Sequence, residues 1–419
     1  MNRPAIALTL WALACGSASA QDAELRVNPE LGNETTQTVT PERKKYPFLN
    51  ADACHIKLNG ADWTPLRTAF AATDSNAVRV LHIGDSHIQA EGSTGRTRKR
   101  LQERYGNAGR GLTAPMRLAG TNGASDYALR STTDMKSARL LKTPWAVAPG
   151  LTGVGVQPAK GGRYDISVSC GDAFDCLRIF TTGTDPYVES LQPEVIAGIS
   201  GVAEGVTEVL LTQAETAVTL TLRDGGSLAG IELLHGNCGV EYSAIGNNGA
   251  TCSNYNALPG FAASTSHLRP DLIIISLGTN EAFGRTSTEA MKAQLHTLVC
   301  SLLEHNPDAT LLLTTPQECY RRRYVRRGKS KRRTRVYAIN PNIEQMRSAI
   351  NAYGAEHNIA VFDWYAAAGG AGSGAKWLSN HLMNTDRVHL TWDGYHLMGD
   401  MLADALLNEL SRTEENESD

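Results

Sequence analysis

Residues 272–280 read LIIISLGTN, and this composition favours one fold class over the others. The run Leu272–Leu277 is almost continuously apolar, as a strand must be when helices cover both faces of a parallel sheet. Helix-like and strand-like patterns alternate after it, at 287–304, 309–314, 341–357 and 360–362. Alternation of this kind predicts an α/β domain with a parallel sheet, which a last helix at 394–410 completes.

The same domain begins upstream with the apolar run 78–83, and a helical stretch at 87–105 follows that run. Before the next buried run, 240–245, the sequence pattern changes. Short strand-like runs separated by Gly, Asp and Pro occupy this region, at 164–169, 177–181, 206–211 and 218–222. Such spacing is typical of a β-sandwich. The sequence therefore predicts a β domain, residues 130–236, inserted between the first two strands of the α/β domain.

The chain of 419 residues divides, on this basis, into six segments. They are a secretory signal (1–20), a linker and lead-in (21–75), the first part of the α/β domain (76–129), the insert (130–236), the second part of the α/β domain (237–411) and an acidic tail (412–419). The net charge of −3 argues against a globally basic nucleic-acid binder, and the 42% apolar content is enough for a sizeable core. No Cys/His cluster has the spacing of a zinc site, and we expect neither a metal nor a cofactor.

Residues 1–20 read MNRPAIALTLWALACGSASA and contain the three parts of a secretory signal. Arg3 precedes a short apolar run, and Ala18-Ser19-Ala20 is a cleavage pattern. We therefore expect export across the inner membrane, to the periplasm or the outer membrane. A lipidated Cys15 is the less favoured alternative, because the Leu that usually stands three residues before such a cysteine is missing.

Seven cysteines remain after the signal, and export permits disulfides. Cys170 with Cys176 and Cys238 with Cys252 are candidate pairs, although the sequence alone does not fix the pairing. An odd number leaves at least one thiol unpaired within the chain.

Two motifs carry the residue types of nucleophilic catalysis. Gly84-Asp85-Ser86-His87 directly follows the first strand, where a serine is exposed at a carboxyl strand end and a backbone N–H can meet an oxyanion. Gly-Asp-Ser is also ordinary turn chemistry. In the second motif, Asp386-Arg387-Val388-His389, Asp386 can hold His389 in the tautomer that a general base requires. The same loop precedes a helix that Thr391 or Asp393 can cap.

Two further turns can supply hydrogen-bond donors. Gly278-Thr279-Asn280-Glu281 ends the LIIISL strand, and the Asn280 amide can donate to an oxyanion; the alternative is an Asx turn. In Gly246-Asn247-Asn248-Gly249-Ala250, the N–H of a glycine can approach a substrate closely, or the segment is simply a tight turn.

Ser, Gly, Asn, Asp and His thus follow one another along the chain at strand ends, and this order resembles the SGNH (GDSL-type) hydrolase superfamily. The resemblance implies a flavodoxin-like, three-layer α/β/α fold. It also implies that Ser86 is the nucleophile, that His389 is the base and that Asp386 orients His389. The oxyanion hole would consist of the Ser86 N–H, the Gly249 N–H and the Asn280 side chain.

Four longer segments, 82–101, 105–112, 362–373 and 386–402, look like the secreted peptidoglycan O-acetylesterase branch of this superfamily. In that branch a β-sandwich similar to carbohydrate-binding modules interrupts the catalytic domain between the first two motifs, which fits the predicted insert. One departure is Glu281, because many members of the wider superfamily carry Asp there, whereas Gly278 and Asn280 are kept.

The segment Arg321–Arg335 holds ten of the chain's 40 Lys and Arg residues. Its place after a strand end predicts contact with an anionic polymer, a membrane surface or a substrate with free carboxylates. A solvated, mobile loop is the alternative. Nucleic acid is not favoured, because only Tyr320 and Tyr324 accompany the charges and no nucleic-acid-binding fold is evident.

The resemblance predicts a secreted serine esterase that removes acetyl groups from the 6-hydroxyl of muramic acid in peptidoglycan, or from a related acetylated glycan. Three alternatives remain open on the sequence. The same triad can serve an O-acetyltransferase or an acetylesterase for another polysaccharide, or the chain can be a glycan-binding protein with an idle site. The sequence leaves the oligomeric state open.

Overall fold

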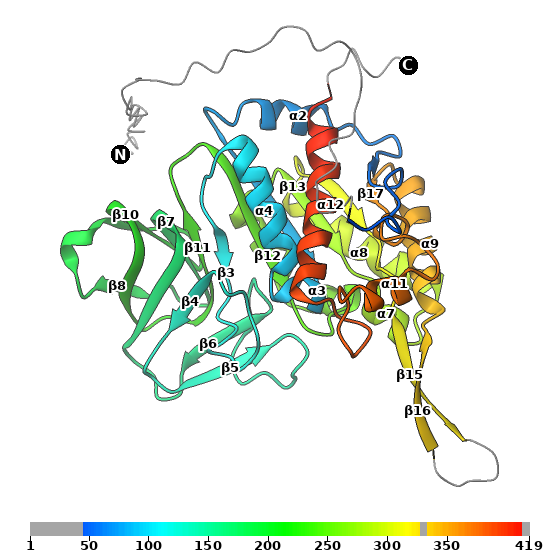
Figure 1. Ribbon diagram of the computed structural model, residues 1–419. Coiled ribbons are helices and arrows are strands. Elements are labelled where there is room, and N and C mark those ends of the chain that lie inside the picture. The colour runs from blue at the N-terminus through cyan, green and yellow to red at the C-terminus, as the bar shows by residue number, and fades with distance from the viewer. Residues whose placement is uncertain (1–44, 327–332, 413–419) are drawn as a thin grey trace, which may run out of the picture. The chain divides into compact units, whose positions relative to one another are not determined.

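The computed structural model describes residues 45–326 and 333–412 (Figure 1). A six-stranded sheet has the spatial order β1-β17-β14-β13-β2-β12. Its parallel strands are β2 (Ala77–Gly84), β12 (Gly239–Gly246), β13 (Leu272–Ser276), β14 (Thr310–Thr314) and β17 (Ala360–Phe362). Taken in chain order, these five strands lie as 2-1-3-4-5, which is the order of flavodoxin-like folds. The predicted α/β fold is therefore confirmed, and the short β1 (Ile56–Lys57) adds one antiparallel strand at the edge.

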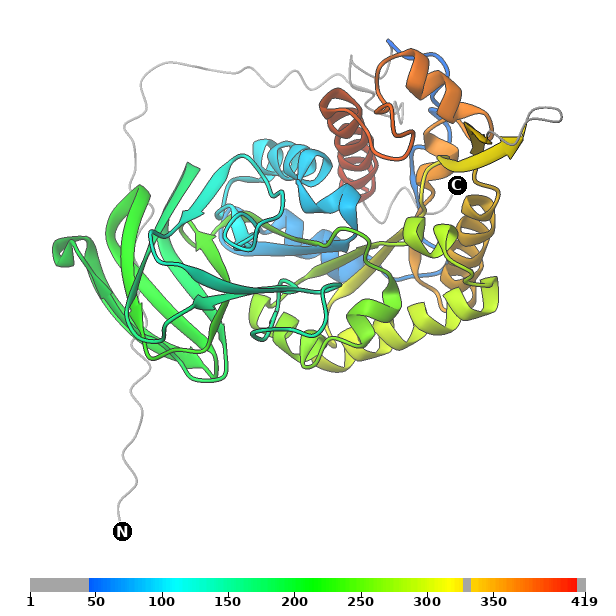
Figure 2. The same ribbon diagram turned by 90° about the horizontal axis from the view of Figure 1, so that it is seen from below.

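Helices cover both faces of this sheet (Figure 2). On one face lie α2 (Thr64–Ala71), α4 (Gly92–Tyr105) and α12 (Trp392–Leu410). On the other lie α5 (Cys252–Asn256), α6 (Phe261–Thr265), α8 (Thr288–His305) and α9 (Asn342–Glu356). Short helices α7 (Thr279–Phe283), α10 (Trp364–Ala367) and α11 (Ser373–Ser379) follow strands or precede α12.

The alternation of side chains along the strands fixes these layers. Val80 of β2 packs in the same buried cluster as Leu101 of α4 and Leu402 of α12, whereas the next residue, Leu81, packs with Leu295 of α8. The central strands are thus buried on both faces, and burial of one apolar side chain contributes about 1.5–3 kcal/mol. This is why the LIIISL run has no polar face.

The helix predicted over 87–105 is divided in the structure into α3 (Ser86–Gln89) and α4. Glu91 lies between them in the left-handed backbone region, with a φ of 55°. Its carboxylate is buried and bonded to Arg98 and Arg110, so a tertiary ion pair interrupts the helical pattern.

A second sheet lies in the chain between β2 and β12 and has nine antiparallel strands. They are β3 (Gly111–Thr113), β4 (Tyr127–Arg130), β5 (Met135–Arg139), β6 (Val154–Pro158), β7 (Tyr164–Thr182), β8 (Tyr187–Ser190), β9 (Ile196–Ala203), β10 (Val206–Arg223) and β11 (Ser227–Leu234). The sheet encloses a buried cluster of its own, which includes Ile166, Leu177 and Leu220. Since β3 and β4 belong to it, the sheet begins before residue 130, the predicted start of the insert. Its assignment as a carbohydrate-binding sandwich stays a prediction.

Four predicted strands of this region are in fact two long ones. The runs 164–169 and 177–181 are both part of β7, and the runs 206–211 and 218–222 are both part of β10. The polar residues between the runs predicted breaks, but β7 and β10 pair with each other on both sides of register shifts near Glu215. Backbone pairing continues through such irregularities, which are typical of bulges.

The disulfide candidates are not supported, because Cys170, Cys176, Cys238 and Cys252 are free thiols. Cys170 and Cys176 lie on the single strand β7, where six residues span about 20 Å. Cys238 and Cys252 flank the eight-residue strand β12, which separates them by a similar or greater length. A disulfide needs Cα atoms about 4–7 Å apart, so neither pair can form in this fold.

The basic segment is not a loop but part of a hairpin, with β15 (Tyr320–Arg326) and β16 (Arg333–Ile339) paired antiparallel as a separate sheet. Residues 327–332 lie outside the described part of the chain, as do the predicted signal, Cys15 and most of the acidic tail. Within the predicted linker and lead-in (21–75), Tyr46, Phe48 and Leu49 pack against the core. None of the helices within residues 45–326 and 333–412 has the length and apolar character needed to cross a bilayer.

Candidate active site

Ser86 is the first residue of α3 and lies at the carboxyl end of β2. The chain packs closely at this turn. A Cβ on Gly84 would lie only 2.2 Å from Cγ1 of Ile88, so a glycine is needed there. Asp85 caps the turn by accepting the His87 N–H at 2.9 Å. From β2 the chain first adds β12 on one side of the sheet and then adds β13 and the later strands on the other side. The gap between β2 and β13 is therefore a topological switch point, which is where open α/β sheets bind ligands.

The structure brings Ser86, His389 and Asp386 together in one hydrogen-bonded chain. Ser86 Oγ lies 2.9 Å from His389 Nε2, and His389 Nδ1 lies 2.7 Å from Asp386 Oδ2. The other oxygen of Asp386 accepts the N–H groups of Val388 and His389, at 2.9 and 3.0 Å. Partial burial opposes the charge on Asp386, but the hydrogen bonds from His389 and the backbone lower its pKa below the usual value. With an ionised Asp386 as acceptor, Nδ1 holds the ring proton and Nε2 faces the serine as an acceptor.

Two backbone N–H groups beside the serine, those of Gly249 and Ser86, are candidate donors to an oxyanion. Gly249 has a φ of 85°, and its N–H has no hydrogen-bond partner within the described part of the chain. The N–H of Ser86 is the first of α3 and so lacks an intrahelical acceptor by position. Both donors lie at turns that follow neighbouring parallel strands, β12 and β2.

Asn280 lies at the same edge, but its amide is already engaged. Nδ2 donates to Asp85 Oδ2 at 3.2 Å and to the Ala250 carbonyl at 3.0 Å. An amide nitrogen has two hydrogens, so Asn280 can serve an oxyanion only by releasing one of these acceptors. The longer bond, to Asp85, is the weaker of the two.

Buried titratable groups surround the serine. Burial, with a further contribution from the charge of Glu281, raises the pKa of Asp85 to about 7. Burial and the neighbouring His389 lower the pKa of His87 to about 3. The rings of His87 and His389 have centroids 5.4 Å apart, and His87 bonds to the hydroxyl of Tyr395 at 3.1 Å. His87 is therefore neutral at pH 7 and does not become protonated in place of His389.

The departure at Glu281 has a structural reason. One carboxylate oxygen accepts the Cys252 N–H at 2.8 Å, and the other accepts the Gly278 N–H at 3.0 Å. Glu281 thus joins the start of α5 to the start of α7, the two turns that carry Gly249 and Asn280. Thr391 similarly caps α12 just after His389, by accepting the Gly394 N–H at 3.2 Å.

Sequence reasoning missed a polar network and one apolar side chain beside the site. Gln89 accepts the Asn248 N–H at 2.6 Å and donates to the side chain of Asn122 at 2.9 Å. Asn248 lies in the quoted GNNGA turn, so its proximity could have been inferred. Asn122 and Leu141 come from the chain between β3 and β6, and no local pattern indicates that they reach the site. A Cβ on Gly249 would lie 3.1 Å from Leu141, which is 43% exposed.

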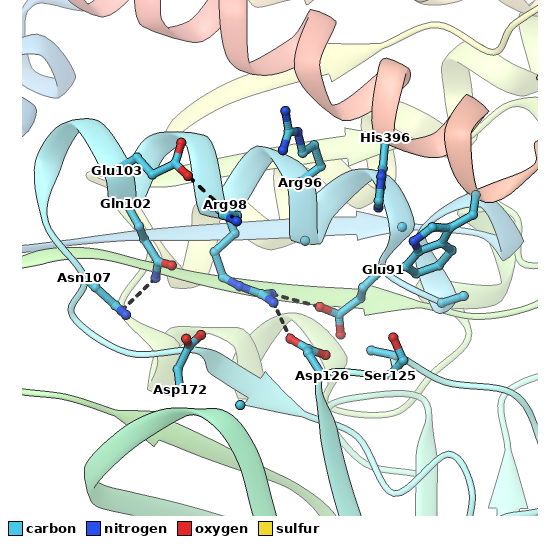
Figure 3. A pocket seen from close by; sticks show the side chains of 17 residues that line it. Glu91, Arg96, Arg98, Gln102, Glu103, Asn107, Ser125, Asp126, Asp172 and His396 are labelled. Atoms are coloured by element: carbon cyan, nitrogen blue, oxygen red, sulfur yellow. Dashed lines mark hydrogen bonds and ion pairs between the residues drawn. The ribbon is translucent and has the colours of Figure 1, made fainter. Parts of the chain in front are cut away.

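A cavity of about 630 Å³ begins four residues after Ser86 and lies between α4 and the nine-stranded sheet (Figure 3). α4 has 14 residues, which corresponds to a length of about 21 Å. The polar and aromatic residues that line the cavity include Arg96, Lys99, Gln102, Asn107, Ser125, Asp172, Trp392 and His396. We call this cavity the α4 groove. Trp392 is 49% exposed and is separated from His389 by only two residues.

An ion cluster of four charged residues borders the α4 groove, and three of them, Glu91, Arg98 and Asp126, line it. Glu91 and Asp126 both bond to Arg98, Glu91 at 3.1 Å (Figure 3). Both carboxylates also bond to Arg110, Glu91 at 2.7 Å. Burial disfavours the charge on Asp126, but Arg110 and Arg98 outweigh it and lower its pKa to about 2. Among residues 45–326 and 333–412, no group of three His, Cys, Asp or Glu side chains is placed to hold a metal ion.

Comparison with known proteins gives the following results. The model of the GDSL-like Lipase/Acylhydrolase family matches residues 224–397, which include Gly249, Asn280, Asp386 and His389 but not Ser86. Among curated proteins, none matches the chain. Of solved structures, a peptidoglycan O-acetylesterase is similar with a TM-score of 0.68 and 21% identity, over 85% of this chain and 99% of that chain.

Two further structures match a smaller part. A lipase/acylhydrolase from Enterococcus faecalis has a TM-score of 0.30 and 18% identity, over 42% of this chain and 80% of its own. An acetylxylan esterase from Geobacillus stearothermophilus has a TM-score of 0.29 and 20% identity, over 42% and 74%. Residues 224–397 thus match the GDSL-like Lipase/Acylhydrolase family, and the fold of the chain, with its flavodoxin-like strand order, is similar to that of a peptidoglycan O-acetylesterase.

Proposed function

We propose that this protein is an exported serine esterase that removes O-acetyl groups from peptidoglycan, at the 6-hydroxyl of muramic acid. The observation that carries the proposal is the chain of hydrogen bonds from Ser86 through His389 to Asp386, at the open carboxyl edge of the sheet. The choice of glycan is supported by the likeness in fold to a peptidoglycan O-acetylesterase, which extends over nearly all of that chain.

In the first half of the reaction, Ser86 Oγ attacks the acetyl carbonyl carbon while its proton moves to His389 Nε2. Asp386 stabilises the imidazolium that forms, since its carboxylate accepts the Nδ1–H. The carbonyl oxygen becomes an oxyanion, which the N–H groups of Ser86 and Gly249 stabilise. When the intermediate collapses, the sugar oxygen leaves and takes the proton from Nε2, so that Ser86 carries the acetyl group.

In the second half, water replaces the sugar. His389 removes a proton from the water as its oxygen attacks the acetyl carbon, and the same two N–H groups bind the second oxyanion. Collapse breaks the bond to Ser86 Oγ, which recovers the proton from Nε2, and acetate leaves. Asn280 adds a third donor if the substrate displaces its bond to Asp85.

The α4 groove suits a glycan strand. Its lining is polar and charged, and the exposed indole of Trp392 offers an apolar face near the site. Ser125 and Asp172 of its lining come from the region of the nine-stranded sheet, so that region contributes to binding in this proposal. This is the role that the resemblance to the esterase branch implies for the insert.

The test is release of acetate from native O-acetylated peptidoglycan, beside chemically de-acetylated material and beside acetylxylan. We expect acetate release above background only from the native peptidoglycan. We expect the Ser86→Ala variant to release no acetate and to keep the wild-type thermal unfolding profile. Ser75→Ala is a matched control, because it makes the same substitution at an exposed serine just before β2, outside both the triad and the α4 groove.

Three results would redirect the proposal. Preference for acetylxylan would move the substrate to another polysaccharide. Transfer of acetyl groups to added glycan oligomers, with little free acetate, would indicate a transferase on the same residues. Tight binding to peptidoglycan without turnover of any ester, aryl acetates included, would indicate a glycan-binding protein.

A further inference from the structure

The β15–β16 hairpin has two different faces. Because side chains alternate along a strand, Tyr320, Arg322 and Tyr324 share one face of β15. Arg322 is opposite Tyr337, and Tyr324 is opposite Arg335, so these partners on β16 lie on the same face. Tyrosine and arginine thus alternate both along and across it. We call these five residues the Tyr–Arg face.

This face is turned toward the loop that carries the triad. The guanidinium of Arg387 lies 5.5 Å from the ring centre of Tyr320 and 4.5 Å from that of Tyr337. The Tyr320 N–H also donates to the Arg387 carbonyl at 2.9 Å. Arg387 directly follows Asp386 in the chain, so the base of the hairpin contacts the loop between the two triad residues. The opposite face carries Arg321 and Arg323.

Beyond Arg387, the Tyr–Arg face is open. Tyr324 is 60% exposed, and Arg322 and Arg335 are exposed as well. Within the described part of the chain, neither arginine forms an ion pair with an acidic side chain. The hairpin extends away from the rest of the α/β domain (Figure 1), so these side chains do not stabilise a core. From Tyr320 to Tyr324 the face is about 13 Å long.

Such a surface has the chemistry of an acidic carbohydrate site. Aromatic rings pack against the C–H face of a sugar ring, and an arginine presents a planar fork of donors that matches a carboxylate. Arginines without acidic partners are available for this purpose. A purely electrostatic surface would not need tyrosines between the charges, and lysine would serve equally well.

We propose that the Tyr–Arg face is a substrate subsite, which binds a glycan strand whose sugars or attached peptides carry carboxylates and guides it to His389. The proposal rests on the proposed function and names the acidic polymer as the preferred form of its substrate. Arg322 and Arg335 bind the carboxylates, and Tyr324 packs against a sugar ring. A small ester that ends at the acetyl group does not reach this face.

The test compares two double variants of equal charge in the full chain. Arg322→Gln with Arg335→Gln alters the Tyr–Arg face, and Arg321→Gln with Arg323→Gln alters the opposite face. The rate of acetate release from O-acetylated sacculi is divided by the rate for an aryl acetate. We expect this ratio to fall by about tenfold or more for the first variant and to stay within about twofold of wild type for the second. An equal fall for both would show that only net charge matters and would overturn the proposal.

Binding separates this inference from the proposed function. With Ser86→Ala added to each double variant, we expect weaker binding to de-acetylated sacculi for the Tyr–Arg variant alone, whether or not the wild type hydrolyses acetylated peptidoglycan. Undiminished binding would refute the inference and leave the esterase intact. If the Tyr–Arg variant instead lost binding only to vesicles of anionic phospholipid, the face would be a membrane contact and not a subsite.

Discussion

The Asp386→Asn substitution reverses one hydrogen bond of the proposed triad and leaves the surrounding loop in place. Asparagine keeps an oxygen that can accept the N–H groups of Val388 and His389, as Oδ1 does now. These two donors fix the orientation of the amide, because the opposite orientation would place its NH₂ against them. The NH₂ then faces His389 Nδ1, which must accept. The ring proton moves to Nε2, where it points at Ser86 and blocks transfer of the serine proton.

The expected loss is large for the reaction and small for the fold. A wrong imidazole tautomer in a triad of this type lowers kcat about 10⁴-fold, which is about 5.4 kcal/mol of barrier. The backbone bonds of the loop are retained, so we expect the free energy of unfolding to change by less than about 1 kcal/mol. Initial rates with an aryl acetate and urea denaturation at the same pH measure the two quantities.

Asp393→Asn is the matched control, because Asp393 is exposed, lies seven residues further along the chain and makes no bond to the triad. It should keep at least about half of the wild-type kcat. If Asp386→Asn kept more than about a tenth of the wild-type rate, Asp386 would not set the tautomer of His389, and the proposed roles of these residues would be wrong.

Three other substitutions test separate parts of the site. Glu281→Gln leaves one of two buried backbone N–H groups without an acceptor, and we expect the free energy of unfolding to fall by about 1–3 kcal/mol in urea denaturation; an unchanged midpoint would contradict this. Burial raises the pKa of Asp85 from 3.8 to about 7, so between these pH values the folded chain holds a proton that the unfolded chain has lost. The wild type should therefore lose up to about 4 kcal/mol of stability from this group as the pH rises from 4 to 8, and Asp85→Asn should remove that loss; parallel pH profiles of the two proteins would refute the reasoning. Trp392→Ala should lower the ratio of sacculus to aryl acetate turnover about fivefold or more through loss of its exposed ring, whereas Leu210→Ala, at a similarly exposed apolar residue on β10, should not.

The sequence was most informative where burial is continuous. The run Leu272–Leu277 predicted a strand, and β13 covers Leu272–Ser276, because both faces of that strand are covered. The nine-stranded sheet was harder, since β7 and β10 remain paired through polar stretches that resemble turns. The hairpin was missed for a related reason. Arginines on both faces of β15 hide the alternation that a half-buried strand shows.

The candidate site was predictable to the extent that it follows strand ends. Ser86 and Asn280 come directly after buried runs, and parallel strands bring their carboxyl ends to one edge. Hydrogen-bond partners were not predictable. The double use of the Asn280 amide depends on packing, as does the approach of Leu141 to Gly249.

The ion cluster beneath the α4 groove has a consequence for how the chain evolves and unfolds. Arg110 is 1% exposed, and its carboxylate partners are Glu91, at the start of α4, and Asp126, just before β4. Loss of a single carboxylate would leave the two buried arginines, Arg98 and Arg110, with one carboxylate between them, and breaking a buried ion pair costs about 3–5 kcal/mol. The two sheets should therefore melt in one calorimetric transition. For the same reason, the nine-stranded sheet cannot be exchanged for another domain by cutting the chain at residues 130 and 236, because Asp126 would stay behind without the strand that holds it.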